Sequence, residues 1–202
     1  MIGFVIRGLA GFQRTHRGPA PGRDCEPSAM RQLIRFALSL ALLLLPSAVM
    51  AQASPHATAS SGSFTILALV TADPDWTKEW SRTDGQPPRL VPASAVTVGD
   101  VAQVIVIFEG AAERQGRLLV ACEISVTTPE GVVHALPVSR CFDRPLDGPT
   151  SASRLLDVDI GLKVEPTDPI GLYRFAIRAT DLFGGGKVAT EISVEVVAKG
   201  GS

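Results

Sequence analysis

The sequence predicts an all-β protein, an antiparallel β-sandwich of about seven strands with one short helix. Three observations support this prediction. Apolar residues recur with a period of two along most of the chain after residue 63, and clusters of Gly, Pro, Asp and Ser separate these stretches. No segment keeps a 3.6-residue apolar period long enough for a substantial helix. A length of 202 residues with 46% hydrophobic residues is enough for one such domain.

The expected strands differ in how apolar and polar residues alternate along them. In residues 118–128 the even-numbered residues from Leu118 to Val126 are apolar, which predicts one buried face. Residues 101–109 are almost all apolar apart from Gln103, which predicts burial on both faces. The seven expected strands are 64–71, 101–109, 118–128, 132–138, 155–164, 171–180 and 187–197.

The N-terminal part resembles an export signal. Residues 30–53 consist of a short basic segment, an apolar run at 36–45, and small residues that offer cleavage after Ala51 or Ala53. The run is shorter than the roughly 20 residues that a membrane-spanning helix needs. We therefore expect a cleaved signal peptide, a periplasmic or secreted protein, and no membrane span after cleavage. Residues 1–29 are interpreted as an incorrectly assigned start upstream of Met30, or as an extended leader.

The rest of the chain is divided into three segments. Residues 54–63 are interpreted as a flexible linker, 64–198 as the sandwich and 199–202 as a tail. Residues 1–53 hold six arginines and two acidic residues, a net charge of +4, which leaves 13 basic and 18 acidic residues, a net charge of −5, for the remainder. A mildly acidic domain gives no reason to expect nucleic acid as a partner.

The last two expected strands predict their own register. Tyr173, Phe175 and Ile177 share one face of 171–180, and arginines share the other. Pairing Arg178 with Glu191 also sets Arg174 opposite Glu195 and Ile177 opposite Ile192, so hydrophobic pattern and charge favour the same register.

Two cysteines, Cys122 and Cys141, follow the leader, and in an oxidising compartment two thiols are expected to form a disulfide. A redox-active pair would have CxxC spacing, which is absent here. Folding the chain about a turn at Glu130 sets Cys122 opposite position 138. The bridge would then fasten the end of this hairpin to the following loop.

The one expected helix lies at 73–80. Asp73 is suited to cap it and Pro74 to its first position. Trp76 and Trp80 would lie on one face. With Lys78, Glu79 and Arg82 nearby, the candidate binding residues Trp76, Lys78, Trp80 and Arg82 could form a platform for a sugar or a protein. The alternative is that the helix plugs an open end of the sandwich and buries both indoles, since aromatic residues are only 5% of the chain.

The segment Pro169-Ile-Gly-Leu-Tyr173-Arg-Phe-Ala-Ile-Arg-Ala-Thr-Asp181 resembles the P-x-G-x-Y-x-F/V-x-V penultimate strand of immunoglobulin-like and macroglobulin-type bacterial domains. The resemblance covers about thirteen residues and implies an Ig-like sandwich. It also implies that Tyr173 packs inward and returns its hydroxyl to upstream backbone. Immunoglobulin domains proper have a cysteine two residues after this tyrosine, where this chain has Phe175.

Catalytic and metal-binding patterns are weak. His134 is the one histidine within the expected sandwich, and no G-x-S-x-G motif accompanies it. Asp157 and Asp159 share one strand face, and Asp143 and Asp147 lie in a polar loop, but no D-x-D-x-D-G calcium loop is present. We expect no cofactor, no metal and no catalytic residues.

Three functional hypotheses follow, in order of preference. The first is a non-enzymatic exported Ig-like domain that mediates protein–protein interaction in the cell envelope, with an envelope protein or surface ligand as its unknown partner. The second is a module that binds a small ligand or glycan through the Trp76 and Trp80 segment. The third is a hydrolase.

Overall fold

The computed structural model describes residues 53–84, 86–136, 140–158 and 160–200. The predicted start region and nearly all of the predicted signal peptide, residues 1–52, lie outside this range. Within the described residues, no helix has the length and apolar character needed to cross a membrane.

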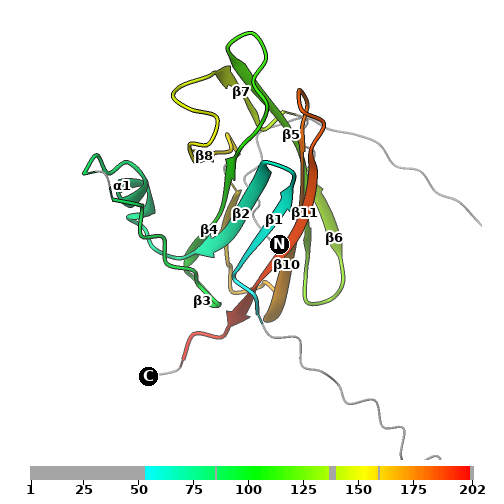
Figure 1. The fold of residues 1–202 in the computed structure, drawn as a ribbon. Coiled ribbons are helices and arrows are strands. Elements are labelled where there is room, and N and C mark those ends of the chain that lie inside the picture. The colour runs from blue at the N-terminus through cyan, green and yellow to red at the C-terminus, as the bar shows by residue number, and fades with distance from the viewer. Residues whose placement is uncertain (1–52, 85, 137–139, 159, 201–202) are drawn as a thin grey trace, which may run out of the picture. The chain divides into compact units, whose positions relative to one another are not determined.

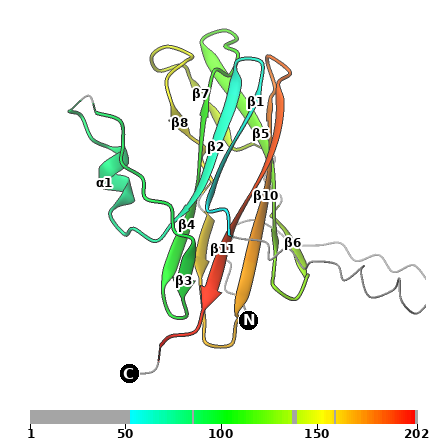
Figure 2. The same cartoon turned by 60° about the horizontal axis from the view of Figure 1, so that its bottom comes forward.

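The described chain folds into two β-sheets packed face to face, with one short helix (Figures 1 and 2). This confirms the predicted all-β sandwich. The first sheet contains β1 (His56–Ser61), β2 (Phe64–Thr71), β4 (Val101–Glu109), β8 (Arg154–Leu155) and β9 (Ile160–Lys163). The second contains β3 (Ala95–Thr97), β11 (Lys187–Val197), β10 (Gly171–Asp181), β5 (Arg117–Thr127), β6 (Val133–Leu136) and β7 (Phe142–Pro145).

The order of the strands is immunoglobulin-like. An immunoglobulin sandwich pairs strands A, B and E in one sheet and strands C, F and G in the other. Here β2 pairs with β4 and β4 with β9, whereas β5 pairs with β10 and β10 with β11, in the same sequential order. Tyr173 lies at the start of β10, and its hydroxyl donates a hydrogen bond to the Pro169 carbonyl at 2.9 Å. The predicted structural role of Tyr173 is therefore confirmed.

The described residues form eleven strands rather than about seven. The predicted strand at 155–164 is divided into β8 and β9, both of which pair with β4. After β8 the Leu156 N–H still donates to the Val106 carbonyl of β4 at 2.9 Å, whereas the Asp157 N–H donates to the Cys141 carbonyl at 2.6 Å. Three short or weakly patterned strands, β1, β3 and β7, were not predicted.

The predicted flexible linker at 54–63 is wrong, because β1 occupies most of it. All six residues of β1 pair with β2, and Gly62 makes the turn with a φ of 63°. Ala57 and Ala59 pack against the core while their neighbours face outward. Just before β1, Ser54 and Ser193 of β11 exchange two hydrogen bonds, each of 2.8 Å. Small residues suit this position, because β1 pairs with β2 and also contacts β11 of the other sheet.

The predicted β10–β11 register is wrong by two residues. Arg178 lies opposite Ala189, Arg174 opposite Ser193, and Phe175 rather than Ile177 opposite Ile192. The difference arises in the turn between the two strands. The buried Asp181 carboxylate accepts a hydrogen bond from the Phe183 N–H, and the Asp181 N–H donates to the Gly186 carbonyl. The turn therefore closes earlier in the sequence than predicted. A shift of two residues leaves every side chain on its predicted face.

The hairpin of β5 and β6 has the predicted register, with Thr127 opposite Val133 and Ile124 opposite Leu136. The predicted disulfide between Cys122 and Cys141 is present, with the two Cα atoms 5.8 Å apart. Cys141 also links the two sheets, because its N–H donates to Val120 of β5 and its carbonyl receives the Asp157 N–H next to β8.

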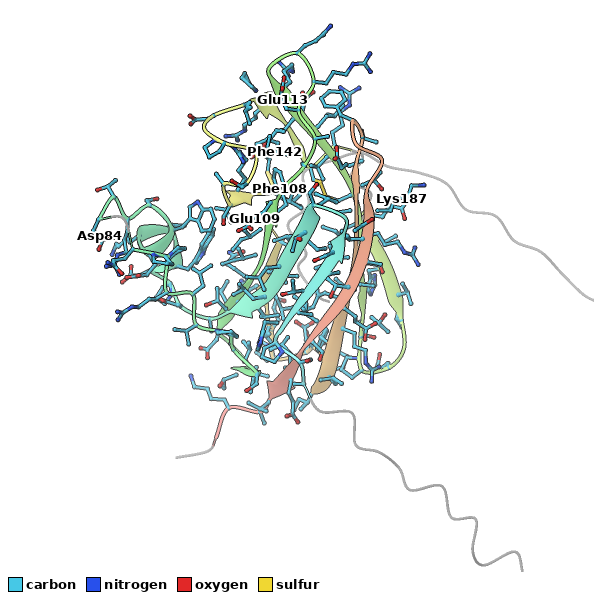
Figure 3. The ribbon with its side chains drawn as sticks, viewed as in Figure 1. Asp84, Phe108, Glu109, Glu113, Phe142 and Lys187 are labelled. Atoms are coloured by element: carbon cyan, nitrogen blue, oxygen red, sulfur yellow. A yellow bond between two sulfur atoms is a disulfide. The ribbon has the colours of Figure 1, made fainter. Side chains whose placement is uncertain are left out.

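The core lies between the sheets and follows the predicted faces. The even-numbered residues of β5 from Leu118 to Val126 are all buried. On β4 the five consecutive residues from Val104 to Phe108 are buried, as expected for a strand covered on both sides. The Phe108 and Phe142 rings pack edge to face, 4.8 Å apart, near the disulfide (Figure 3). The outward residues of β4, Ile105 and Ile107, belong to a second, smaller apolar cluster.

Candidate functional site

The predicted tryptophan segment covers the outer face of the first sheet. Helix α1 (Trp76–Trp80) begins two residues later than the predicted Asp73 cap would place it, because the Asp73 carboxylate forms a turn with the Asp75 N–H at 2.8 Å. Trp76 and Trp80 are both half-buried, and they pack with Leu90 against Leu69, Ile105 and Ile107.

We call residues 72–84 and 86–92 the strap, because both of its ends are fastened to the end of β2. At its start the Asp73 N–H donates to the Thr71 hydroxyl, and at its end the Ala93 N–H donates to the Val70 carbonyl at 2.8 Å. Between these points α1 has no buried residue and no side-chain cap. The strap is therefore a closed loop held to the sheet mainly by its two indoles and Leu90.

The charged residues of the strap pair with one another. Lys78 contacts the Asp75 carboxylate at 2.6 Å, and this hydrogen bond raises the pKa of Lys78. Arg82 contacts Glu79 at 3.1 Å and also Asp84, which raises the pKa of Arg82 and lowers that of Asp84. The structure thus brings all four predicted binding residues onto the strap, but both cations are already bound to carboxylates. The indoles face the sheet rather than an end of the sandwich.

The second sheet has an outer face that sequence analysis did not single out. It carries an open hollow with a volume of about 920 Å³. The floor is made of small side chains, Ala121, Ser125, Ala135, Ala176 and Ala189. In the described part of the chain no helix or strand covers this face, which lies away from α1 (Figure 2). The alternating small residues of β5 and β10 are the signal that could have revealed it.

The rim of this hollow carries charge. Arg178 lies opposite Glu123 of β5, with an N–O distance of 3.6 Å, and Lys187 lies at the β11 end (Figure 3). Arg174 contacts Glu191 diagonally at 3.9 Å, whereas Glu195 lies opposite Leu172 and makes no ion pair among the described residues. All these side chains are at least partly exposed, so each pair contributes little to stability. Arg178 therefore pairs with Glu123 instead of the predicted Glu191.

The buried polar side chains are used within the fold. Five such residues occur in the described chain, Thr71, Thr128, Asp168, Asp181 and Ser193, and each accepts a hydrogen bond from a backbone N–H. These contacts lie at turns and chain crossings. His134 is exposed on β6. Within the described residues no group of three or more His, Cys, Asp or Glu side chains could hold a metal ion.

Comparison with known proteins gives little further information. No protein-family model matches this sequence, and no curated protein matches it significantly. A chain of a family 123 glycoside hydrolase from Clostridium perfringens is similar in structure, with a TM-score of 0.33 and 11% sequence identity. The match covers 66% of this chain and only 28% of the hydrolase chain. A likeness of this size does not indicate a function.

Proposed function

We propose that this chain is an exported, non-enzymatic Ig-like module that mediates protein–protein interaction in the cell envelope. Its contact surface would be the outer face of the second sheet, which no described helix or strand covers. One observation carries the proposal: among the described residues, the strap packs on the outer face of the first sheet, whereas no helix or strand covers the outer face of the second sheet.

The chemistry of the face supports contact with a protein. Small side chains on the floor let another backbone approach closely, and the charged rim of Glu123, Arg178 and Lys187 offers polar contacts around it. Interfaces commonly combine a less polar centre with a charged rim in this way.

The non-enzymatic part of the proposal is supported by how polar groups are used. Catalysis needs titratable groups that converge in a site with their reactive atoms available. The five buried polar side chains instead accept backbone hydrogen bonds at turns and crossings. Because the indoles are half-buried against the sheet, the strap offers weaker support for the alternative of glycan binding.

Site-specific photo-cross-linking in the producing organism would test the proposal. A benzophenone amino acid is placed at Ala189, which lies exposed in the hollow, and as a matched control at Thr58, which lies exposed on β1. We expect a discrete cross-linked product from position 189 only, and we expect Arg178→Glu to reduce its yield about ten-fold. Equal products from both positions, or none from position 189, would contradict the proposal.

A further inference from the structure

Among the described strands, β6 is an edge strand of the second sheet and lies next to the hollow. Strand β6 (Val133–Leu136) pairs with β5 on one side, and in the described part of the chain no strand lies on its other side. It also lies at the margin of the fold in both views (Figures 1 and 2). An edge of this kind presents a row of backbone donors and acceptors.

The register identifies which backbone groups point outward. The Thr128 N–H donates to the Val132 carbonyl at 2.9 Å, so residues 128 and 132 are a hydrogen-bonded pair. In an antiparallel ladder such pairs alternate with pairs that exchange no bonds. The pairs Thr127–Val133 and Ser125–Ala135 are therefore of the second kind, and the N–H and C=O groups of Val133 and Ala135 point away from β5.

Two other edges of the described sheets are better protected than the edge of β6. Natural proteins protect edges with charged residues or proline, or cover them with other segments. β9 carries the exposed Lys163, and the edge of β11 is covered by β3 and by Ser54. Residues 132–136 contain no charged residue and no proline, and the side chain of Val133 is 62% exposed.

We propose that the β6 edge is a strand-addition site, at which an extended, uncharged segment of a partner protein pairs with the main chain of Val133 and Ala135. The occupant must be extended, because only an extended backbone matches both outward residues. β-branched residues suit it best, because its side chains would lie beside Val133 and Ala135 at the margin of the hollow. The inference rests on the proposed function and specifies the kind of partner.

Peptide selection tests the proposal directly. A phage library of random dodecapeptides is selected on the full chain, and recovered peptides are measured against Val133→Lys, Ala135→Pro and the control Val91→Lys. Val91 is also 62% exposed but lies in the strap. We expect alternating, β-branched peptides whose binding weakens about ten-fold with either β6 variant and not with the control. Recovery of no such peptides, or equal binding to all variants, would overturn the proposal.

Amide hydrogen exchange provides a second readout that does not depend on the fold of a variant. In the wild-type chain the amides of Val133 and Ala135 should exchange faster than that of Leu136, which faces β5. A bound peptide should slow both by about ten-fold. Unchanged exchange would overturn strand addition, as would concentration-dependent pairing of two copies through β6 with no peptide bound. If the product at Ala189 persists while β6 variants have no effect, the proposed function stands and this inference fails.

Discussion

Tyr173 is the only tyrosine of the chain, and it links its own ionisation to folding. Burial raises its pKa to about 12, with Asp168 and Glu130 adding to the effect, whereas an unfolded tyrosine has a pKa of about 10. As the pH rises, the unfolded state therefore ionises first. The stability contributed by the neutral hydroxyl is fully present below about pH 10 and is lost as the pH rises through about 12.

We predict that Tyr173→Phe lowers the free energy of unfolding by about 1 kcal/mol near neutral pH, because it removes the hydrogen bond to Pro169. The variant should also lose less stability than the wild type between about pH 10 and about pH 12. Urea unfolding of both proteins across this pH range measures the difference. Parallel pH profiles would show that Tyr173 does not carry the alkaline dependence.

Among the elements, the faces of the strands could be predicted but their partners only in part. Because side chains alternate between the two faces of a strand, the sequence pattern predicts which side chains of β10 are buried. A register error of two residues therefore leaves each side chain on its predicted face. The register itself depends on Asp181, whose buried carboxylate also receives the Ala112 N–H from a distant loop. Nothing local to the sequence reveals that contact. β1 was missed because its Ala and Ser residues have low strand propensity and depend on β2 and β11 for support.

The candidate surfaces, too, could be predicted from the sequence only in part. The tryptophan pair was identified from composition and spacing, but its contact with Ile105 and Ile107 depends on which face of β4 points outward. The hollow and the β6 edge arise from the lateral order of strands, which is a property of the whole sheet.

The strap allows a prediction about an element. Trp76→Ala removes one of the few side chains that hold the strap to the sheet, so the strap should detach without unfolding the sandwich. We expect limited trypsin digestion after Arg82 and Arg89 to become about ten-fold faster, with little change in global stability. Thr77→Ala is the matched control, because Thr77 is exposed on the same helix. Equal digestion rates for both variants would contradict this role for the indole.

At the scale of the whole molecule, the disulfide fastens Cys141 to β5 of the second sheet, at the point where a backbone hydrogen bond links Cys141 to the segment after β8 of the first sheet. Cys141 is bonded to Cys122 of β5, and its backbone carbonyl receives the Asp157 N–H beside β8, so the covalent bond holds the crossing between the sheets in place. The bridge closes a sequence separation of 19 residues. Both cysteines are buried, so we expect reduction to require opening of the sandwich.

We predict that Cys122→Ala combined with Cys141→Ala lowers the free energy of unfolding by about 3 kcal/mol, mainly because the unfolded chain regains the freedom of the closed loop. The loss should appear in urea unfolding as a lower midpoint of one cooperative transition, because both sheets share a single core. Ser125→Ala, on the outward face of the same strand, is the control and should change stability by less than about 0.5 kcal/mol. Two separate unfolding transitions in the double variant would show that the disulfide at Cys141 couples the two sheets. A free energy of unfolding equal to that of Ser125→Ala would show that the disulfide does not stabilise the fold.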